Sequence, residues 1–222
     1  MCGRFAQYSS LDSIQEYFGI KDVTCDIAPS YNIAPTHDVH AVICRDSRPR
    51  IGKLKWGIAP SWNSGLIINA RAETLSEKPF FRTAFQKRRC LIIGDGFYEW
   101  KKQGKHRQQP WYFSLASGEP IAFAGIWEPP NERSDVFTCS VITCKASESV
   151  REIHSRMPVI LTKQSMENWL NPDLYDSEKL TEILMHCHVR EFRSFPVDPG
   201  VSSVRCNSPK CIIPIDQRTF GI

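Results

Sequence analysis

Several short stretches of the chain place hydrophobic residues at helical spacing. Residues 11–18 (LDSIQEYF) put their apolar side chains on one helical face, and either Ser10 or Asp12 is suited to cap this helix. The same periodicity predicts three further helices, at residues 80–87, 163–170 and 177–186.

Other stretches show the alternation or the unbroken apolar run that is typical of β-strands. They are residues 38–45, 53–58, 90–100 and 137–144. Residues 111–115 and 121–127 flank the Ser117-Gly118 turn, which predicts two paired strands. The tail from Glu191 onward is extended and rich in turns.

The order of these elements indicates the fold class. Strands are interspersed with short helices, without the regular alternation that builds a parallel sheet, and no linker divides the chain. We therefore expect one α+β domain over residues 1–222. Its β-sheet should be mixed, largely antiparallel and barrel-like, with short flanking helices.

Composition adds few constraints. The chain has 222 residues, 41% of them hydrophobic, and a formal net charge of +4, which permits a nucleic-acid partner without requiring one. It begins MCGRFAQYSS, without the features of a signal peptide, and contains no apolar run long enough for a membrane helix. We expect an intracellular, cytoplasmic protein, nucleoid-associated in a bacterium, whose nine cysteines are mostly reduced thiols.

The N-terminal motif MCGRF carries the first candidate chemistry. Removal of the initiator methionine would leave Cys2 with an α-amine of pKa about 7.7–8.0 beside a thiol of pKa about 8.5. Such an aminothiol traps aldehydes, because the amine forms an imine and the thiol then closes a thiazolidine ring. Gly3 leaves room for close approach, and Arg4 is suited to bind a phosphate. Many chains begin Met-Cys by chance, so this motif alone does not establish the role.

Two further motifs contain residues suited to contact DNA. In YNIAPT (31–36), Asn32 can form hydrogen bonds and Pro35 can present a flat apolar surface, although the motif alone indicates only a turn. In WGIAPSW (56–62), Trp62 follows a Pro-Ser turn, where an exposed ring can stack on a nucleobase for about 1–3 kcal/mol. A packing tryptophan is an equally good interpretation of that motif.

Polar residues alternate in INARAET (68–74). On a strand, Asn69, Arg71 and Glu73 would project to one face. This face is either part of a site or an ordinary solvated surface of the sheet.

Two motifs supply candidates for proton transfer. Glu99 lies between aromatic residues in GDGFYEW (94–100), where burial would raise its pKa, although an ordinary exposed glutamate fits equally well. In IHSRMPVIL (153–161), His154 and Arg156 alternate before an apolar strand, and histidine is the side chain best suited to proton transfer near neutral pH. A lone histidine is more often structural.

Taken together and in this order, these six motifs resemble one family closely, the SOS-response-associated peptidase (SRAP) family. They extend from residue 2 to residue 161, and the remaining C-terminal residues are less distinctive.

The resemblance implies a function and assigns roles to residues. SRAP proteins recognise abasic sites in single-stranded DNA and at junctions with duplex, and they shield the lesion by a thiazolidine crosslink through the N-terminal cysteine. Abasic-site lyase activity and a peptidase activity are further expectations, and no cofactor, metal or membrane is implied for a protein expected to be monomeric. The catalytic residues would be Cys2, Asn69, Glu99 and His154. The phosphate contacts would be Arg4, Arg71 and Arg156, and the residues that shape and wedge the DNA would be Asn32, Pro35 and Trp62.

Three alternatives stay open at this point. A thiol peptidase would use Cys2 as nucleophile with His154 or Glu99 as its base. A metal-binding module would use Cys187, His188, Cys206 and Cys211, although their spacing is not that of a tight zinc site. Finally, the basic residues 87–89 and 101–108 are interpreted as solvated surface, with DNA contact as the lesser alternative.

Overall fold

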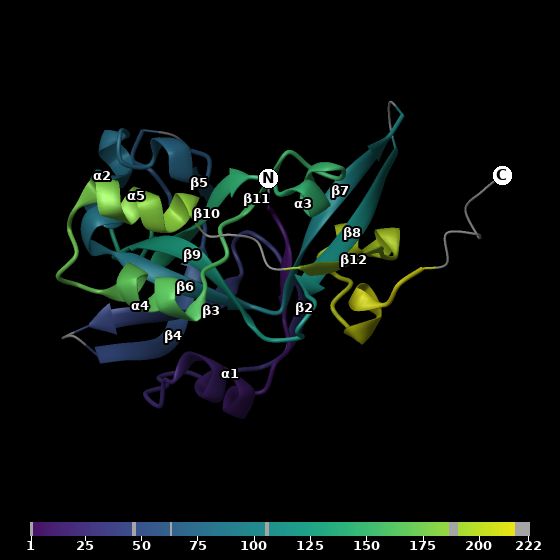
Figure 1. The fold of residues 1–222 in the computed structure, drawn as a ribbon, viewed down its shortest axis with the longest axis horizontal. Coiled ribbons are helices and arrows are strands. Elements are labelled where there is room, and N and C mark those ends of the chain that lie inside the picture. The colour runs from purple at the N-terminus through teal and green to yellow at the C-terminus, as the bar shows by residue number, and fades with distance from the viewer. Residues whose placement is uncertain (1, 46–47, 63, 105–106, 187–190, 216–222) are drawn as a thin grey trace.

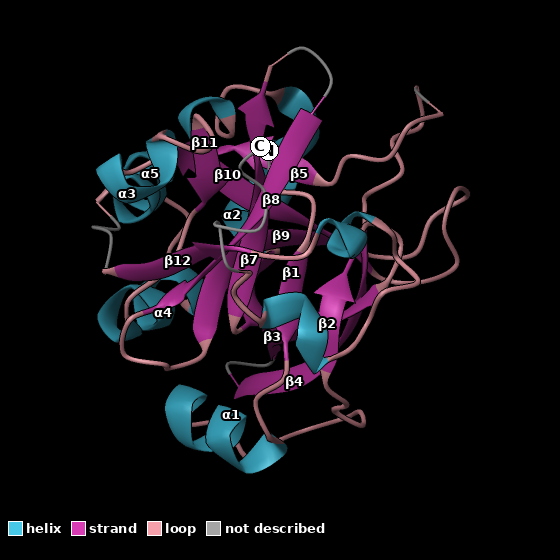
Figure 2. Ribbon diagram, turned by 90° about the vertical axis from the view of Figure 1, so that its right-hand side faces the viewer, coloured by secondary structure: helices cyan, strands magenta, loops and turns pink. Residues whose placement is uncertain are grey.

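The computed structural model describes residues 2–45, 48–62, 64–104, 107–186 and 191–215. These residues form an α+β fold with two β-sheets and short helices at their periphery, as Figures 1 and 2 show. The predicted fold class is confirmed.

The larger sheet closes on itself. Antiparallel neighbours run from β4 through β3 and β6 to β9, and β10 completes the ring by pairing antiparallel with β9 and parallel with β4. This ring accounts for the barrel-like, mixed character that the sequence predicts. Its strands are β3 (Asp38–Arg45), β4 (Arg48–Trp56), β6 (Arg89–Gly94), β9 (Ile121–Glu128) and β10 (Thr138–Lys145).

Two short strands extend this sheet beyond the ring. Past its pairing with β4, β10 pairs in parallel with β5 (Asn69–Arg71) and antiparallel with β11 (Arg156–Pro158). Three candidate residues, at the ends of β5 and β11, are thereby brought to the same region of the sheet.

The smaller sheet has five strands in the order β12-β8-β7-β1-β2, all antiparallel. The short N-terminal strand β1 lies inside this sheet, between β2 and β7. The strands are β1 (Phe5–Gln7), β2 (Ser30–Ile33), β7 (Gly96–Gln103), β8 (Arg107–Leu115) and β12 (Phe192–Pro196).

The hairpin predicted around the Ser117-Gly118 turn is wrong. The strand that ends at Leu115 pairs with β7 and β12, whereas the strand that begins at Ile121 pairs with β6 and β10, so the turn connects the two sheets. Both Leu115 and Ile121 are buried in the core between the sheets. A local apolar–turn–apolar pattern is the same whether the turn joins paired strands or separate sheets.

The strand predicted over residues 90–100 is two strands, which separate at Asp95. The Asp95 carboxylate accepts the backbone N–H groups of Tyr8 and Ser9, the latter at 2.8 Å, so the chain changes sheets at a buried hydrogen-bonded carboxylate. The step from β6 to β7 places Glu99 in the smaller sheet.

Two further expectations need correction. Glu73 does not continue the strand of Asn69 and Arg71, because the chain turns into a 3₁₀ helix over Ala72–Thr74. Residues 87–89 are not simply a solvated face, because Arg88 forms an ion pair with Glu128 and Arg89 is buried. The Arg89 guanidinium donates to backbone carbonyls at the ends of two helices, α2 (Pro79–Lys87) and α4 (Lys163–Leu170).

Aromatic side chains fill the space between the two sheets. The ring of Phe5 lies 5.2 Å from Trp56 and 5.5 Å from Phe123, and Phe97 stacks on Phe113 with ring centroids 5.0 Å apart. Each of these rings is essentially inaccessible to solvent. Burial of this size is the largest favourable contribution to folding, and it holds β1 against the ring of strands.

Helices cover the outer face of the larger sheet, where α2, α4 and α5 lie together in Figure 1. In the described chain, the side chains of Ser10, Thr162 and Asp176 cap α1, α4 and α5. Of the two residues proposed to cap the first helix, Ser10 and Asp12, Ser10 is the cap. None of the helices in the described part of the chain is long and apolar enough to cross a membrane. The helices are α1 (Leu11–Phe18), α2 (Pro79–Lys87), α3 (Glu148–Arg151), α4 (Lys163–Leu170) and α5 (Ser177–Met185).

We predict that Gly96→Ala destabilises the fold by about 2–3 kcal/mol, because the added methyl group would overlap neighbouring atoms. A Cβ at this position would lie 2.5 Å from the carbonyl oxygen of Phe113 and 2.3 Å from the Tyr112 ring. Urea unfolding measures the change. Ser114→Ala, at the position paired with Gly96, is the control and should change stability by less than about 0.5 kcal/mol. Equal effects of the two substitutions would contradict this account.

Candidate functional site

Cys2 lies where the two sheets meet. It lies three residues before the start of β1, is 1% exposed and packs in the core among the aromatic side chains between the sheets. From the larger sheet, the Asn69 side chain donates an Nδ2–H to the backbone carbonyl of Cys2 at 2.8 Å. Asn69 is itself held in place, because the preceding Ile68 carbonyl accepts from the Trp56 indole at 2.8 Å and from the Val141 N–H at 3.0 Å.

Glu99 lies on β7, next to the N-terminal strand, with a side chain only 3% exposed. Burial raises the pKa of its carboxyl to about 7, because the ionised form loses water. The alternative of an ordinary exposed glutamate is therefore rejected. A carboxyl with this pKa can both donate and accept a proton near neutral pH.

His154 follows α3 and approaches the same carboxyl. Its Nδ1 lies 3.7 Å from Glu99 Oε1, and the backbone N–H of Arg156 donates to the same nitrogen at 3.0 Å. Burial lowers the pKa of His154, which favours the neutral ring. The carbonyl oxygen of Arg156 lies 3.0 Å from the same nitrogen.

The Cys2 thiol is kept protonated by its surroundings. Burial, and then the negative charge of Glu99, raise its pKa well above that of a free cysteine. Its Sγ lies 3.7 Å from the carbonyl oxygen of Arg4. The four predicted catalytic residues are thus brought together around a shielded thiol: Asn69 and Glu99 come from strands of the two sheets, and Cys2 and His154 from the segments before β1 and β11.

Arg4 and Asn32 contact the C-terminal segment. Arg4 donates to Asn32 Oδ1 at 2.7 Å and to the carbonyls of Val201 and Ser202 at 2.8 and 2.9 Å. Asn32 is 1% exposed, and its amide donates to the carbonyls of Val201, Ser203 and Cys206. Their side chains therefore hold residues 201–206, in addition to any contact with DNA.

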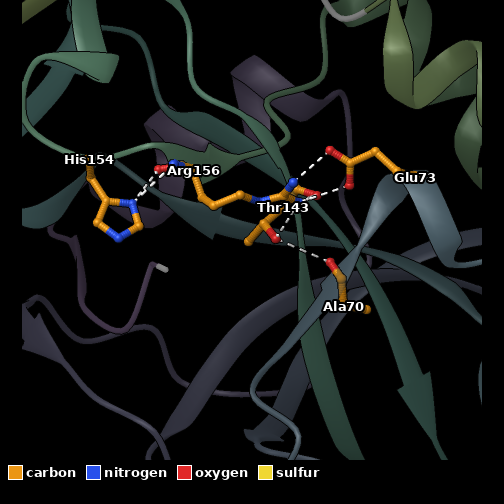
Figure 3. A network of polar contacts seen from close by, with 5 residues as sticks. All are labelled: Ala70, Glu73, Thr143, His154 and Arg156. Atoms are coloured by element: carbon orange, nitrogen blue, oxygen red, sulfur yellow. Dashed lines mark hydrogen bonds and ion pairs between the residues drawn. The ribbon is translucent and has the colours of Figure 1, made fainter.

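Arg156 is engaged in an internal network, shown in Figure 3. Its guanidinium forms a bidentate ion pair with Glu73 at 2.6 and 3.0 Å and also donates to the Thr143 carbonyl at 2.6 Å. Thr143 in turn donates to the Ala70 carbonyl at 3.4 Å. The network ties the beginning of β11, just after His154, to the residues that follow Asn69.

The remaining candidates lie at the surface. Arg71 is exposed at the end of β5, two residues after Asn69. Trp62 is 64% exposed, so it is a surface rather than a core tryptophan, and its ring meets Phe80 edge to face at 4.5 Å. Pro35 is half-buried beside Thr36, whose φ of 76° marks a tight turn.

The described residues give no support to the alternative of a metal-binding module. Among the described residues, no three His, Cys, Asp or Glu side chains are grouped so that they could hold a metal ion. Cys206 and Cys211 are adjacent, with Sγ atoms 3.3 Å apart, whereas Cys187 and His188 lie outside the described residues.

Comparison with known families identifies the family of this chain. The family model described as SOS response associated peptidase (SRAP) matches residues 1–204. The chain belongs to the SRAP family. The match extends well past residue 161, where the distinctive motifs end, and reaches into the segment 201–206 that Arg4 and Asn32 hold.

Curated SRAP relatives are similar over most of this chain. Abasic site processing protein YoqW of Bacillus subtilis is 40% identical over 221 residues, which cover 96% of this chain and 99% of the relative. Abasic site processing protein YedK of Escherichia coli is 30% identical and covers 97% of this chain and 100% of its own. Abasic site processing protein HMCES of Rattus norvegicus is 32% identical over 85% of this chain and 65% of its own length.

Solved structures share the SRAP fold of this chain. A protein from Bacteroides thetaiotaomicron has a TM-score of 0.80 at 21% identity, covering 96% of this chain and 100% of its own. A phage-related protein from Bordetella bronchiseptica has a TM-score of 0.75 at 27% identity, covering 88% and 94%.

Two features of this SRAP site have no signal in the sequence motifs. The segment 201–206 contacts Arg4 and Asn32 through backbone carbonyls, which every residue type possesses. Phe80 supports Trp62 from the start of a helix, where its aromatic side chain is also expected for packing.

We predict that Glu99→Gln stabilises this SRAP protein increasingly as pH rises. The pKa of Glu99 is raised in the fold from 4.5 to about 7, so the folded state binds the extra proton and loses stability as pH rises through this window. Removing the charge should then stabilise the fold by about 3 kcal/mol above pH ~7, and by nothing below pH ~4.5. Melting temperatures at pH ~4.5 and ~8 measure the difference.

The matched control for this substitution is Glu148→Gln. Its carboxylate is 90% exposed, so its replacement should shift the melting temperature equally at both pH values. A pH-independent effect at Glu99 would refute the assigned cause.

Proposed function

We propose that this chain binds abasic sites in single-stranded DNA, including sites at junctions with duplex, and shields them by a covalent thiazolidine crosslink through Cys2. The observation that carries the proposal is the buried Cys2 thiol beside the buried Glu99 carboxyl, whose pKa is about 7; removal of Met1 would make Cys2 an aminothiol at this place. Family membership and the names of the curated relatives, abasic site processing proteins, support the same function.

The chemistry requires removal of Met1, which frees the α-amine of Cys2. The ring-opened deoxyribose of an abasic site carries an aldehyde at its first carbon. The amine adds to this carbon and water leaves to form an imine; the Cys2 sulfur then adds to the same carbon. One aldehyde and one aminothiol thus yield one thiazolidine and one water.

Asn69 is suited to orient the amine. Its Nδ2 donates a hydrogen bond to the Cys2 carbonyl, while its Oδ1 is buried without a hydrogen-bond partner among the described residues. A buried acceptor of this kind costs free energy unless a donor reaches it. The α-amine of processed Cys2 is on the same residue and supplies such a donor.

Glu99 is suited to both proton transfers at the reacting carbon. In its protonated form it donates to the departing hydroxyl as the imine forms. The resulting carboxylate then accepts the Cys2 thiol proton as sulfur attacks. Because the raised pKa keeps the thiol protonated, the amine reacts first and the thiol second.

His154 is suited to ring opening of the sugar. In the tautomer protonated on Nε2, its ring can give that proton to the sugar ring oxygen while Nδ1, 3.7 Å from Glu99 Oε1, takes one from the Glu99 carboxyl. Glu99 then regains a proton from the C1 hydroxyl as the aldehyde forms, so the proton count balances and Glu99 is again protonated for the next step. The reverse sequence of proton transfers would release the aldehyde, and the imine stage is the one from which a lyase reaction would proceed.

We assign the direct contacts with DNA to the candidate residues that are exposed. Arg71 offers a guanidinium to the backbone beside Asn69, and Trp62, supported by Phe80, offers a ring on which an adjacent base can stack. Pro35 is assigned to the wedge. Arg4, Asn32 and Arg156 form hydrogen bonds inside the protein, so we assign them to supporting the DNA-binding surface. Their N–H groups that are not used in these bonds can contact a phosphate.

A thiol peptidase is the competing function, and the family description includes the word peptidase. A cysteine peptidase needs a thiolate, which requires a lowered thiol pKa. Burial and Glu99 raise the pKa of Cys2 instead, which favours chemistry that begins at the amine. Peptide turnover measured beside DNA crosslinking separates the two functions.

We predict that Cys2→Ala abolishes a covalent adduct with abasic single-stranded DNA, because both the thiol and the ring closure are lost. The measurement is the shifted band on a denaturing gel, with intact mass spectrometry to establish that Met1 has been removed. Cys25→Ala, which removes a half-buried thiol elsewhere, is the control and should leave the adduct unchanged. A Cys2→Ala adduct of normal intensity would sink the proposal.

Arg71→Ala is expected to weaken binding to single-stranded DNA and to lower the slope of log affinity against log salt by about 0.7, the value for one phosphate contact. Fluorescence anisotropy over a salt series measures this slope. Arg48→Ala removes an exposed arginine at the start of β4, outside the proposed surface, and should leave the slope unchanged. Identical slopes for Arg71→Ala and the unchanged protein would exclude the phosphate contact.

A further inference from the structure

Two thiols lie in contact near the C-terminal end of the described chain. The Sγ atoms of Cys206 and Cys211 are 3.3 Å apart, and both cysteines are unoxidised. Cys206 is partly exposed, whereas Cys211 is 1% exposed. One thiol is thus accessible from solvent and the other is reached through it.

A cavity opens beside this pair. Its volume is about 440 Å³, and both cysteines line it together with Asp198, Ser208, Lys210 and Ile213. The cavity gives a small molecule access to the Cys206 sulfur.

Polar side chains hold the segment that lies between the thiols and the catalytic region. Asn32 donates to the Cys206 carbonyl at 2.7 Å and Arg4 donates to the Val201 carbonyl at 2.8 Å. The Tyr98 hydroxyl lies 3.5 Å from the Cys211 carbonyl. Residues 201–211 therefore form a strap across Arg4 and Asn32, and Arg4 is two positions from Cys2.

We propose that Cys206 and Cys211 form a reversible disulfide, with a low-molecular-weight disulfide as oxidant, which locks this strap over Arg4 and Asn32. The Cys206 thiolate attacks the small disulfide and releases one thiol. The Cys211 thiolate then attacks the mixed disulfide, releases the second thiol and closes the Cys206–Cys211 bond. Two protein thiols are oxidised, one small disulfide is reduced, and two protons pass to the released thiolates.

The other described cysteines do not combine these properties. Cys90 and Cys139 are fully buried in the core, where an oxidant has no access. Cys25, Cys44 and Cys144 are partly exposed, but among the described residues none of them has a second thiol in sulfur contact. Cys25 therefore serves as the matched control, a partly exposed cysteine with no second thiol in contact among the described residues.

The sequence around the pair allows a direct test. Trypsin cleaves after Arg205 and after Lys210, so Cys206 and Cys211 fall in separate peptides, 206–210 and 211–218. The full-length protein is equilibrated with oxidised glutathione, free thiols are alkylated, and the protein is digested without reductant. The expected product is the two peptides joined and two hydrogen atoms lighter than their sum, separating on addition of dithiothreitol.

The variants and a stability measurement complete the experiment. Cys206→Ser should abolish the joined peptide, whereas Cys25→Ser should leave it intact. Oxidation should raise the melting temperature by about 3–6 °C in the unchanged protein and not in Cys206→Ser, because a closed loop restricts the unfolded chain. The proposal is overturned by absence of the joined peptide, by glutathione retained on Cys206, or by a melting temperature that oxidation does not change.

Discussion

The insertion of β1 between β2 and β7 is the constraint on which the candidate site depends. Three residues of strand hold the N-terminus inside a sheet, and the buried Phe5 ring packs against Trp56 and Phe123 of the other sheet. Cys2 then lies at the seam between the sheets, where Asn69 binds its carbonyl at 2.8 Å. Flexible chain ends are usually poorly ordered, so a reactive terminal residue needs this kind of support.

The same burial sets the electrostatics of the site. It raises the pKa of Glu99 to about 7 and that of the Cys2 thiol still further, and it lowers the pKa of His154. All three shifts favour neutral groups, so protons can move between them without a large charge being created in a site of low polarity. The consequence is a loss of stability at neutral pH, because burial keeps the Glu99 carboxyl from water where it would otherwise ionise.

Sequence reasoning reached the fold class, most helices and the convergence of Cys2, Asn69, Glu99 and His154. The four residues were grouped by the resemblance of their motifs to one family, and the structure places them close together. The sequence-based predictions were wrong where the path of the backbone determines the structure. The turn after Leu115 connects the two sheets, and Glu73 lies in a 3₁₀ helix after the strand of Asn69, where it forms an ion pair with Arg156. Sequence reasoning also missed that Arg4 and Asn32 hold the strap, since the acceptors are carbonyls that no sequence pattern marks.

These internal contacts change how the basic residues of the site are understood. A guanidinium with three hydrogen bonds to protein, as in Arg4, is already oriented, so less rotamer entropy remains to be lost when an anion binds. Arg71 has the opposite character, since it is exposed and free to follow the ligand. The strap therefore contributes to preorganisation of the site although it contains none of the distinctive motifs, which is consistent with a family match that continues to residue 204.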